Sequence, residues 1–136
     1  MSPTNQIPRI LIVDDSVVAR RMLVGQLREL GYSDVVESAS AEDALAKLHE
    51  SRKGVPFSPI VADLRKPGMP GDQFVQRLQQ ETDFKVIPKL IASVETDRLV
   101  VLNALLCGAD GYILKPTSTP VLKEKLSKIF AKEKVS

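Results

Sequence analysis

Three aspartates and one lysine in this chain come directly after short apolar runs. Asp14 and Asp15 follow the first run, Asp63 follows a second, and Lys115 follows a third. A fourth run ends in Ser93. Such runs are typical of buried β-strands, and the carboxyl ends of parallel strands lie at one edge of a sheet. We therefore expect these five side chains to meet in one acidic site that contains a single cation and a hydroxyl.

Such a site favours magnesium and phosphate chemistry. Three neighbouring carboxylates repel one another unless a cation balances their charge. Magnesium fits best, because it takes oxygen ligands from a few carboxylates and keeps other positions for water and phosphate oxygens. A lysine as a point charge and a serine as a hydrogen-bond donor are suited to bind a phosphoryl group.

The rest of the chain supplies the elements that position this site. Apolar runs alternate with helical patterns, which is typical of a parallel sheet covered on both faces. We expect five strands at about residues 9–13, 34–37, 60–62, 86–93 and 111–114. We also expect five helices, namely one that ends at Gly31, one that begins at the N-cap Ser40, and three at about residues 72–80, 96–107 and 119–131.

Taken together, the motifs of this chain resemble those of the receiver domain of bacterial response regulators, the CheY-like family. The resemblance spans residues 9–132 and rests on several short motifs that occur in a fixed order. These motifs are Asp14-Asp15-Ser16, Asp63 with Pro67, Gly68 and Gly71, Ser93, the run 108–112, and Lys115-Pro116. The spacing agrees as well, since Ser93 comes 30 residues after Asp63 and Lys115 comes 22 residues after Ser93.

The resemblance implies the fold class. It is an α/β, flavodoxin-like (βα)5 fold, a doubly wound parallel sheet with strand order 2-1-3-4-5 in a single domain. The receiver domain would occupy residues 9–132. We expect residues 1–8 to be disordered or loosely ordered and residues 133–136 to form a C-terminal tail.

The resemblance also implies a role for each residue of the acidic site. Asp63 would be the phospho-acceptor. Asp14 and Asp15 would bind Mg²⁺ together with Asp63 and the backbone carbonyl of Arg65. Lys115 would pair with the phosphoryl oxygens.

Two further residues would couple the site to a change of conformation. Ser93 would donate a hydrogen bond to the phosphoryl group once it is present. Tyr112 would be the aromatic side chain that rotates when the domain switches.

The implied function is that of a single-domain response regulator. It would accept a phosphoryl group from a sensor histidine kinase or a histidine phosphotransfer protein and would switch the binding of a partner in phosphorelay signal transduction. Phosphotransfer and autodephosphorylation would be self-catalysed, so the chain would not be a conventional metabolic enzyme. No second cofactor beyond Mg²⁺ is expected.

Two alternatives remain open at this point. A pseudo-receiver would keep the fold and bind partners without phosphorylation, and Val94, Arg65 and Lys66 favour it because they depart from the family pattern beside the acceptor. A magnesium phosphatase of the haloacid dehalogenase type also uses an aspartate nucleophile. That family needs one residue between its two aspartates, whereas Asp14 and Asp15 are adjacent.

Composition places the chain among globular cytoplasmic proteins. Its 136 residues include 26% charged residues, and the net charge of +2 is too small to predict direct binding to nucleic acid. No apolar run approaches the ~20 residues of a membrane span. The single cysteine, Cys107, permits no internal disulfide and fits a reducing compartment.

The segment 96–107 is apolar almost all round, which is unusual for a helix that covers one face of a sheet. One side must pack on the sheet. We expect the other side to contribute, with the strand 111–114 and the helix 119–131, to a surface that binds a downstream target or a second copy of the chain.

Overall fold

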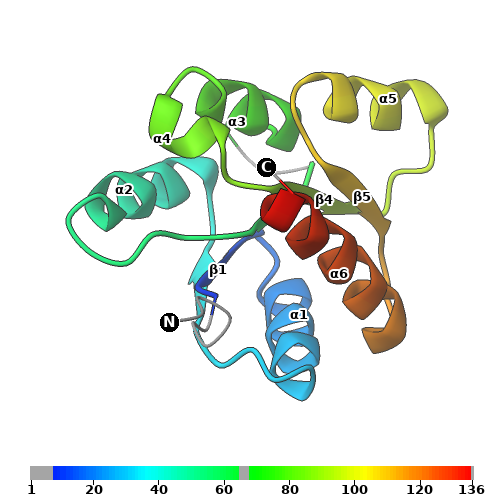
Figure 1. Cartoon of the computed structure of the whole chain (residues 1–136). Coiled ribbons are helices and arrows are strands. Elements are labelled where there is room, and N and C mark those ends of the chain that lie inside the picture. Colours follow the sequence, from blue (N-terminus) through cyan, green and yellow to red (C-terminus); the bar gives the residue numbers. More distant parts are fainter. Residues whose placement is uncertain (1–7, 65–67, 136) are drawn as a thin grey trace.

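Five parallel strands form the centre of the molecule, in the order β2-β1-β3-β4-β5 (Figure 1). The computed structural model describes residues 8–64 and 68–135. The strands are β1 (Ile10–Val13), β2 (Val35–Ser38), β3 (Ile60–Ala62), β4 (Lys89–Ser93) and β5 (Gly111–Leu114). This is the flavodoxin-like order that the family resemblance implied, so the fold class is confirmed. The N-terminal residues 1–7, expected to be loosely ordered, lie outside the described residues.

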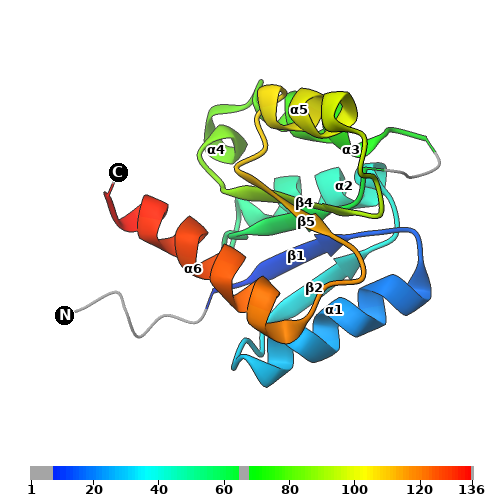
Figure 2. The ribbon, with the colours of Figure 1, turned by 90° about the vertical axis from the view of Figure 1, so that its right-hand side faces the viewer.

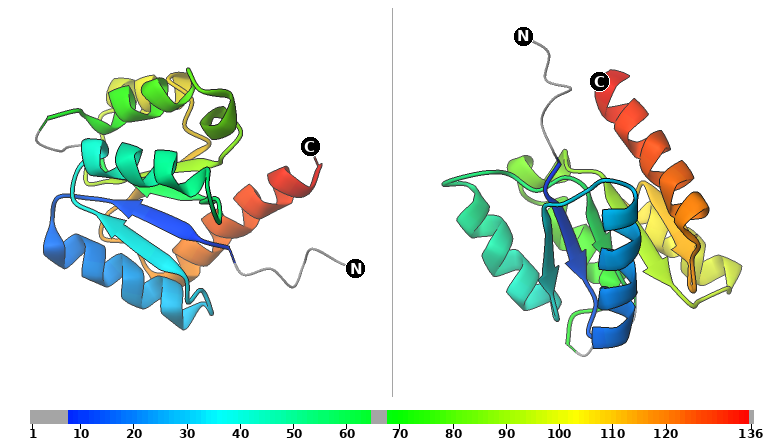
Figure 3. Two further views of the ribbon diagram at one scale, coloured as in Figure 1. Left: turned by 90° about the vertical axis from the view of Figure 1, so that its left-hand side faces the viewer. Right: turned by 90° about the horizontal axis from the view of Figure 1, so that it is seen from below.

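Helices cover both faces of the sheet (Figures 2 and 3). One face carries α1 (Val17–Glu29) and α6 (Thr119–Val135), and the other face carries the remaining helices. These are α2 (Ala41–Ser51), α3 (Gly71–Leu78), the short α4 (Thr82–Lys85) and α5 (Arg98–Leu106). No helix in the described part of the chain combines the length and apolar character needed to cross a membrane.

The sheet divides the hydrophobic core into two layers, and the interior strand β1 contributes to both. Leu11 and Val13 pack into the layer below α2, α3 and α5, whereas Ile10 and Ile12 pack into the layer below α1 and α6. All four side chains are fully buried. A strand covered on both faces has no polar side, which explains why β1 reads as a continuous apolar run rather than an alternating one.

The predicted signals at helix ends are confirmed. Ser40 is the N-cap of α2, and its hydroxyl accepts a hydrogen bond from the backbone N–H of Asp43 at 3.0 Å. Gly31 follows the end of α1 with φ of +96°. The backbone N–H groups of Gly31 and Tyr32 donate to the carbonyls of Arg28 and Leu27, which is the Schellman arrangement that a left-handed glycine permits.

Two predicted boundaries were wrong around residues 80–90. A sixth helix, α4, follows α3, and β4 begins at Lys89 instead of Val86. Val86 is the C-cap of α4 and is 75% exposed, so it belongs to the surface and not to the sheet. A helix of four residues is too short to show a hydrophobic period, which is why the sequence did not reveal it. At the other end of the chain, α6 continues to Val135, past the predicted end at Ala131.

A cluster of charged side chains anchors α4 to the rest of the domain. Glu81, just before α4, pairs with Arg52, the C-cap of α2, and with Arg77 of α3. Partial burial works to raise the pKa of Glu81, but hydrogen bonds from Arg52, Arg77 and His49 outweigh it and lower that pKa to about 2. The Arg52 guanidinium also lies over the ring of Phe84, 4.7 Å from its centroid. The cluster therefore joins three helices at one corner.

Lys89, the first residue of β4, caps the C-terminal end of α4. Although it is a lysine, it is only 1% exposed. Its ammonium group donates to the carbonyls of Phe84 at 2.8 Å, Lys85 at 3.1 Å and Ile87 at 2.5 Å. These carbonyls lie at the C-terminal end of a helix, where a cation is favoured. Burial lowers the pKa of Lys89 to about 8, with the carboxylate of Asp110 acting in the opposite direction.

We predict that Lys89 makes the stability of the domain depend on alkaline pH. Its pKa is lower in the folded chain than the ordinary value of 10.5, so the unfolded chain binds the proton more tightly. The free energy of unfolding should then rise between about pH 8 and pH 10, relative to that of Lys89→Met, by roughly 2 kcal/mol. Urea denaturation of both proteins across this range measures the difference. Parallel pH profiles would contradict the assignment.

Candidate functional site

The fold brings the predicted site residues to one edge of the sheet. Asp63 follows β3 directly, and its backbone N–H donates to the carbonyl of Val13 at the end of β1, at 3.0 Å. Lys115 follows β5 directly, and its N–H donates to the carbonyl of Ser93, the last residue of β4, at 2.8 Å. These bonds continue the ladders beyond the strands. They fix the backbone positions from which the side chains of Asp63 and Lys115 extend.

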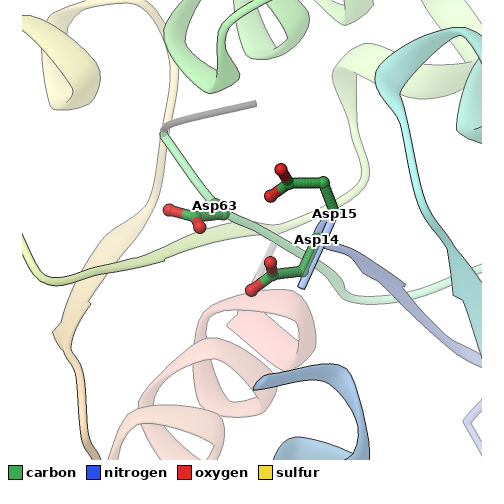
Figure 4. A group of neighbouring side chains, drawn as sticks. All are labelled: Asp14, Asp15 and Asp63. Carbon is green, nitrogen blue, oxygen red and sulfur yellow. The ribbon is translucent and has the colours of Figure 1, made fainter. Parts of the chain in front are cut away.

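The three carboxylates of the site converge (Figure 4). One oxygen from each of Asp14, Asp15 and Asp63 lies within 4.8 Å of the other two. Asp14 is buried, Asp63 is half-buried and Asp15 is exposed. The set therefore has a closed inner side and an open outer side. A ligand can approach from solvent past Asp15.

The donor set fits a magnesium ion. Mg²⁺ prefers oxygen ligands at about 2.0–2.1 Å, so opposite ligands of one ion are about 4 Å apart. A small closing movement would bring three oxygens that lie within 4.8 Å into that range. Three carboxylates are hard oxygen donors, and the exposed side leaves positions for water or a phosphate oxygen.

Lys115 supplies the positive charge of the site. Its ammonium group pairs with the carboxylate of Asp14 and lies 3.2 Å from Oδ2 of Asp63. The side chains of Lys115 and Asp63 are each 14% exposed. At this depth water screens charges poorly, so the ammonium group offsets much of the repulsion between the two carboxylates.

Asp14 is also held through its other oxygen. Oδ1 accepts a hydrogen bond from the backbone N–H of Ser16 at 2.9 Å. Ser16 is in turn the N-cap of α1, and its hydroxyl accepts from the N–H of Ala19 at 3.1 Å. The turn after β1 therefore orients the Asp14 carboxylate and starts the next helix at the same time.

Gly71 allows α3 to begin directly against the acceptor segment. Its N–H donates to the carbonyl of Leu64 at 2.9 Å. A Cβ atom on Gly71 would lie 2.2 Å from the backbone oxygen of Asp63 and 2.8 Å from Cα of Leu64. Both neighbours are backbone atoms that cannot rotate away. The sequence showed Gly71 as part of a motif, but only the three-dimensional structure shows why there is no room for a side chain at this position.

Ser93 and Tyr112 lie on the neighbouring strands β4 and β5 and contact the same residue. Ser93 is fully buried, and its hydroxyl accepts from the N–H of Glu95 at 3.2 Å. The Tyr112 hydroxyl donates to the carbonyl of the same Glu95 at 2.8 Å. The segment after β4 is therefore bonded both to the end of its own strand and to the aromatic ring of the next one.

Two of the positions that depart from the family pattern fall outside the described residues. They are Arg65, whose backbone carbonyl was expected to be a metal ligand, and Lys66. Val94, the third such position, is 58% exposed.

Sequence reasoning missed Arg20. This residue of α1 donates from Nη1 to the backbone carbonyl of Asp14 at 2.6 Å, and its Nε lies 3.1 Å from Glu37 of β2. The contact depends on the register that places β2 beside β1, in which Ile12 pairs with Glu37. No pattern in the sequence indicates that register.

The arrangement as a whole is suited to accept a phosphoryl group. A carboxylate at the end of a central strand has a cation within hydrogen-bond distance, and two further carboxylates beside it can hold a metal ion. Phosphoryl transfer depends mainly on positioning and on charge neutralisation, which this set provides.

Comparison with known proteins places the chain in a family. The family model "Response regulator receiver domain" matches residues 10–127. The chain is 37% identical over 126 residues to the chemotaxis protein CheY-3 of Vibrio cholerae, covering 93% of this chain and 94% of that protein. It is 35% identical to the chemotaxis protein CheY of Pseudomonas aeruginosa, with 90% and 95% covered.

A similar structure is known as well. The structure of the chemotaxis response regulator CheY4 of Vibrio cholerae matches with a TM-score of 0.81 at 30% identity, covering 91% of this chain and 99% of that one.

We predict that Gly71→Ala destabilises the domain, because its Cβ would overlap the backbone of Asp63. Forcing an extra methyl group into a filled space costs about 1–3 kcal/mol. Gly25→Ala is a matched control, since a Cβ there meets nothing within 4 Å. Gly25 lies inside α1, so that change should stabilise the chain by about 0.5–1 kcal/mol. Urea denaturation compares both variants with the parent, and equal effects would contradict the close approach.

Proposed function

We propose that the chain, which belongs to the response regulator receiver family, is a magnesium-dependent phospho-acceptor switch with Asp63 as the acceptor. CheY-like receiver domains act in two-component signalling and are switches, not metabolic enzymes. The observation that carries the proposal is the position of Asp63. It follows the central strand β3, has Lys115 at 3.2 Å, and shares its site with Asp14 and Asp15.

In the proposed reaction an oxygen of the Asp63 carboxylate attacks the phosphorus of a phosphohistidine on a partner protein. The new bond joins that oxygen to phosphorus. The phosphorus–nitrogen bond breaks, and its electron pair leaves with the imidazole. A carboxylate is a weak nucleophile, so the rate depends on how well the site positions the group and neutralises its charge. Reaction of the aspartyl phosphate with water restores Asp63 and releases phosphate.

Asp14, Asp15 and Asp63 would hold Mg²⁺, and the backbone carbonyl of Arg65 would complete the protein ligands. The ion, when bound, would neutralise charge on the phosphoryl oxygens. Asp14 is already fixed by Ser16 and Lys115, whereas Asp15 stands at the open side. This difference gives the site one rigid and one accessible ligand.

Lys115 would change partners during the reaction. Its ammonium group now pairs with Asp14 and Asp63. Once Mg²⁺ and a phosphoryl group are present, those carboxylates have other partners, and the ammonium group can pair with a phosphoryl oxygen instead. Ser93, at the end of the neighbouring strand, would donate its hydroxyl hydrogen to another phosphoryl oxygen.

The switch would pass through the segment after β4. Ser93 and Tyr112 both bond to Glu95, so a shift of the Ser93 hydroxyl toward the acceptor would change one of the contacts that hold this segment. The segment leads into α5. Phosphorylation would thereby shift the population between two arrangements of α5, with Tyr112 as the rotating side chain.

The proposed partners follow from the chemistry. A sensor histidine kinase or a histidine phosphotransfer protein would supply the phosphoryl group, in the cytoplasm. The output would be contact with another protein and would not involve nucleic acid directly or a membrane.

The output surface would be the face formed by α5, β5 and α6. Ala104 is the one buried side chain of α5, and most of the large apolar side chains of this helix are exposed in the described structure. Leu99 and Leu106 are each 76% exposed, and Leu102 is 50% exposed. A helix this apolar and this exposed is typical of a surface that binds a protein.

A pseudo-receiver that binds partners without phosphorylation is the alternative. Val94, which follows Ser93 and is 58% exposed, favours it, because a side chain of this bulk would narrow the approach to Asp63. The two functions differ in one respect that can be measured, namely whether Asp63 reacts.

We predict that acetyl phosphate with Mg²⁺ adds one phosphoryl group to the native chain, as detected by mass spectrometry. Asp63→Asn should abolish the adduct. Asp34→Asn is the matched control, because Asp34 is an exposed aspartate that precedes β2, at the opposite edge of the sheet. The adduct should survive that change and disappear when EDTA removes Mg²⁺. An unmodified native chain under all conditions would favour the pseudo-receiver.

We also predict that beryllofluoride, a phosphoryl mimic, makes the chain self-associate through α5 at high concentration in size-exclusion chromatography with Mg²⁺. Leu99→Gln combined with Leu106→Gln should prevent the shift. Val86→Gln is the control, because Val86 is 75% exposed and lies outside the proposed face. A native chain that stays monomeric would rule out self-association and leave a different protein as the partner of this face.

A further inference from the structure

Arg20 occupies an unusual position for a cation beside an acidic site. Its guanidinium does not neutralise the carboxylate of Asp14, which pairs with Lys115. It donates instead to the backbone carbonyl of Asp14, at 2.6 Å. That carbonyl belongs to the peptide that joins Asp14 to Asp15. Arg20 therefore holds the backbone between two of the three carboxylates of the site.

Glu37 fixes the guanidinium from the other side. Its carboxylate lies 3.1 Å from Nε of Arg20, and the Arg20 side chain is only 14% exposed. Glu37 is fixed in turn, because it lies in β2 in register with Ile12, and its backbone carbonyl accepts from the ammonium group of Lys47 at 2.5 Å. The rigid planar fork of an arginine presents Nε and Nη1 to these two acceptors in a fixed geometry, which the single flexible ammonium group of a lysine does not reproduce.

The two aspartates depend on this contact to different degrees. Asp14 is buried and held through both carboxylate oxygens, by Ser16 and by Lys115. Asp15 is exposed. The direction of its side chain is set largely by the plane of the peptide before it. Fixing that peptide is therefore a way to keep the Asp15 carboxylate near Asp14 and Asp63.

We propose that Arg20, aligned by Glu37, is a positioning residue of the metal site: it holds the 14–15 peptide so that the Asp15 carboxylate faces Asp14 and Asp63. The inference rests on the proposed function, because it assumes that these carboxylates bind Mg²⁺. It adds a residue that touches neither the metal nor the phosphoryl group and acts through the backbone.

Removal of Arg20 should change the affinity for Mg²⁺ in the direction opposite to the one that simple electrostatics predicts. Removing a positive charge beside three carboxylates should tighten the binding of a cation. If Arg20 positions Asp15, its removal should weaken binding instead. Loss of a residue that orients a metal ligand typically weakens metal affinity about 10- to 100-fold. The direction of the change therefore separates the two roles.

The test is a titration of the full chain with Mg²⁺ alone by isothermal titration calorimetry at fixed ionic strength. We expect Arg20→Ala to bind Mg²⁺ about tenfold more weakly than the native chain. Arg21→Ala is the matched control, because Arg21 is the next residue of the same helix and is exposed. It removes the same charge and should leave the affinity unchanged or slightly higher.

Arg20→Lys is a second variant, which keeps the proposal testable if Arg20→Ala does not fold. It keeps the charge but loses the planar fork that holds the two contacts in a fixed geometry, so electrostatics predicts no change in affinity and the positioning role predicts weaker binding. Circular dichroism identifies any variant that has unfolded. Binding as tight as native in Arg20→Lys, or tighter than native in folded Arg20→Ala, would overturn the inference alone. A native chain that binds no Mg²⁺ would overturn both the inference and the metal part of the proposed function.

Discussion

The repulsion among three carboxylates at one edge of the sheet is the constraint that organises this domain. Asp14, Asp15 and Asp63 lie close enough for their charges to oppose folding. Lys115 offsets this repulsion by pairing with two of them from the end of β5. The topology makes the pairing possible, because the order β2-β1-β3-β4-β5 brings the ends of β1, β3 and β5 to the same edge. The proposed function uses this balance, because a bound Mg²⁺ ion would replace the ammonium group of Lys115 as the partner of these carboxylates.

At the opposite edge of the sheet, where no ligand is expected, a buried positive charge has partners within the chain itself. Lys89, at the start of β4, is as buried as Asp14, but three backbone carbonyls of the chain accept from its ammonium group. Its charge is satisfied by helix α4, and the contact serves the fold. Among the described residues, the ammonium group of Lys115 pairs with the carboxylates of Asp14 and Asp63, and both carboxylates would also be ligands of Mg²⁺ in the proposed function. The two lysines illustrate the difference between a charge that serves the fold and one that, in the proposed function, would bind a ligand.

The sequence was a good guide to the features that depend on local pattern. Strand ends carried the acidic site, Ser40 and Gly31 marked helix ends, and the alternation of strands and helices predicted the sheet. It failed where the structure depends on distant contacts or very short elements. The four-residue α4 shows no period, and the start of β4 moved to Lys89 because α4 precedes it. The roles of Gly71 and Arg20 arise from close approaches across the fold, which a single sequence cannot show.

The central claim is that Asp63 is the acceptor and that Lys115 moves from the carboxylates to the group that arrives there. A crystal structure of the chain with Mg²⁺ and beryllofluoride tests this most directly. The account predicts density for beryllofluoride on an oxygen of Asp63, a metal ion among Asp14, Asp15 and Asp63, and the ammonium group of Lys115 on a fluorine atom. Density on another residue, or a Lys115 that still pairs with Asp14 while Asp63 carries the mimic, would contradict it.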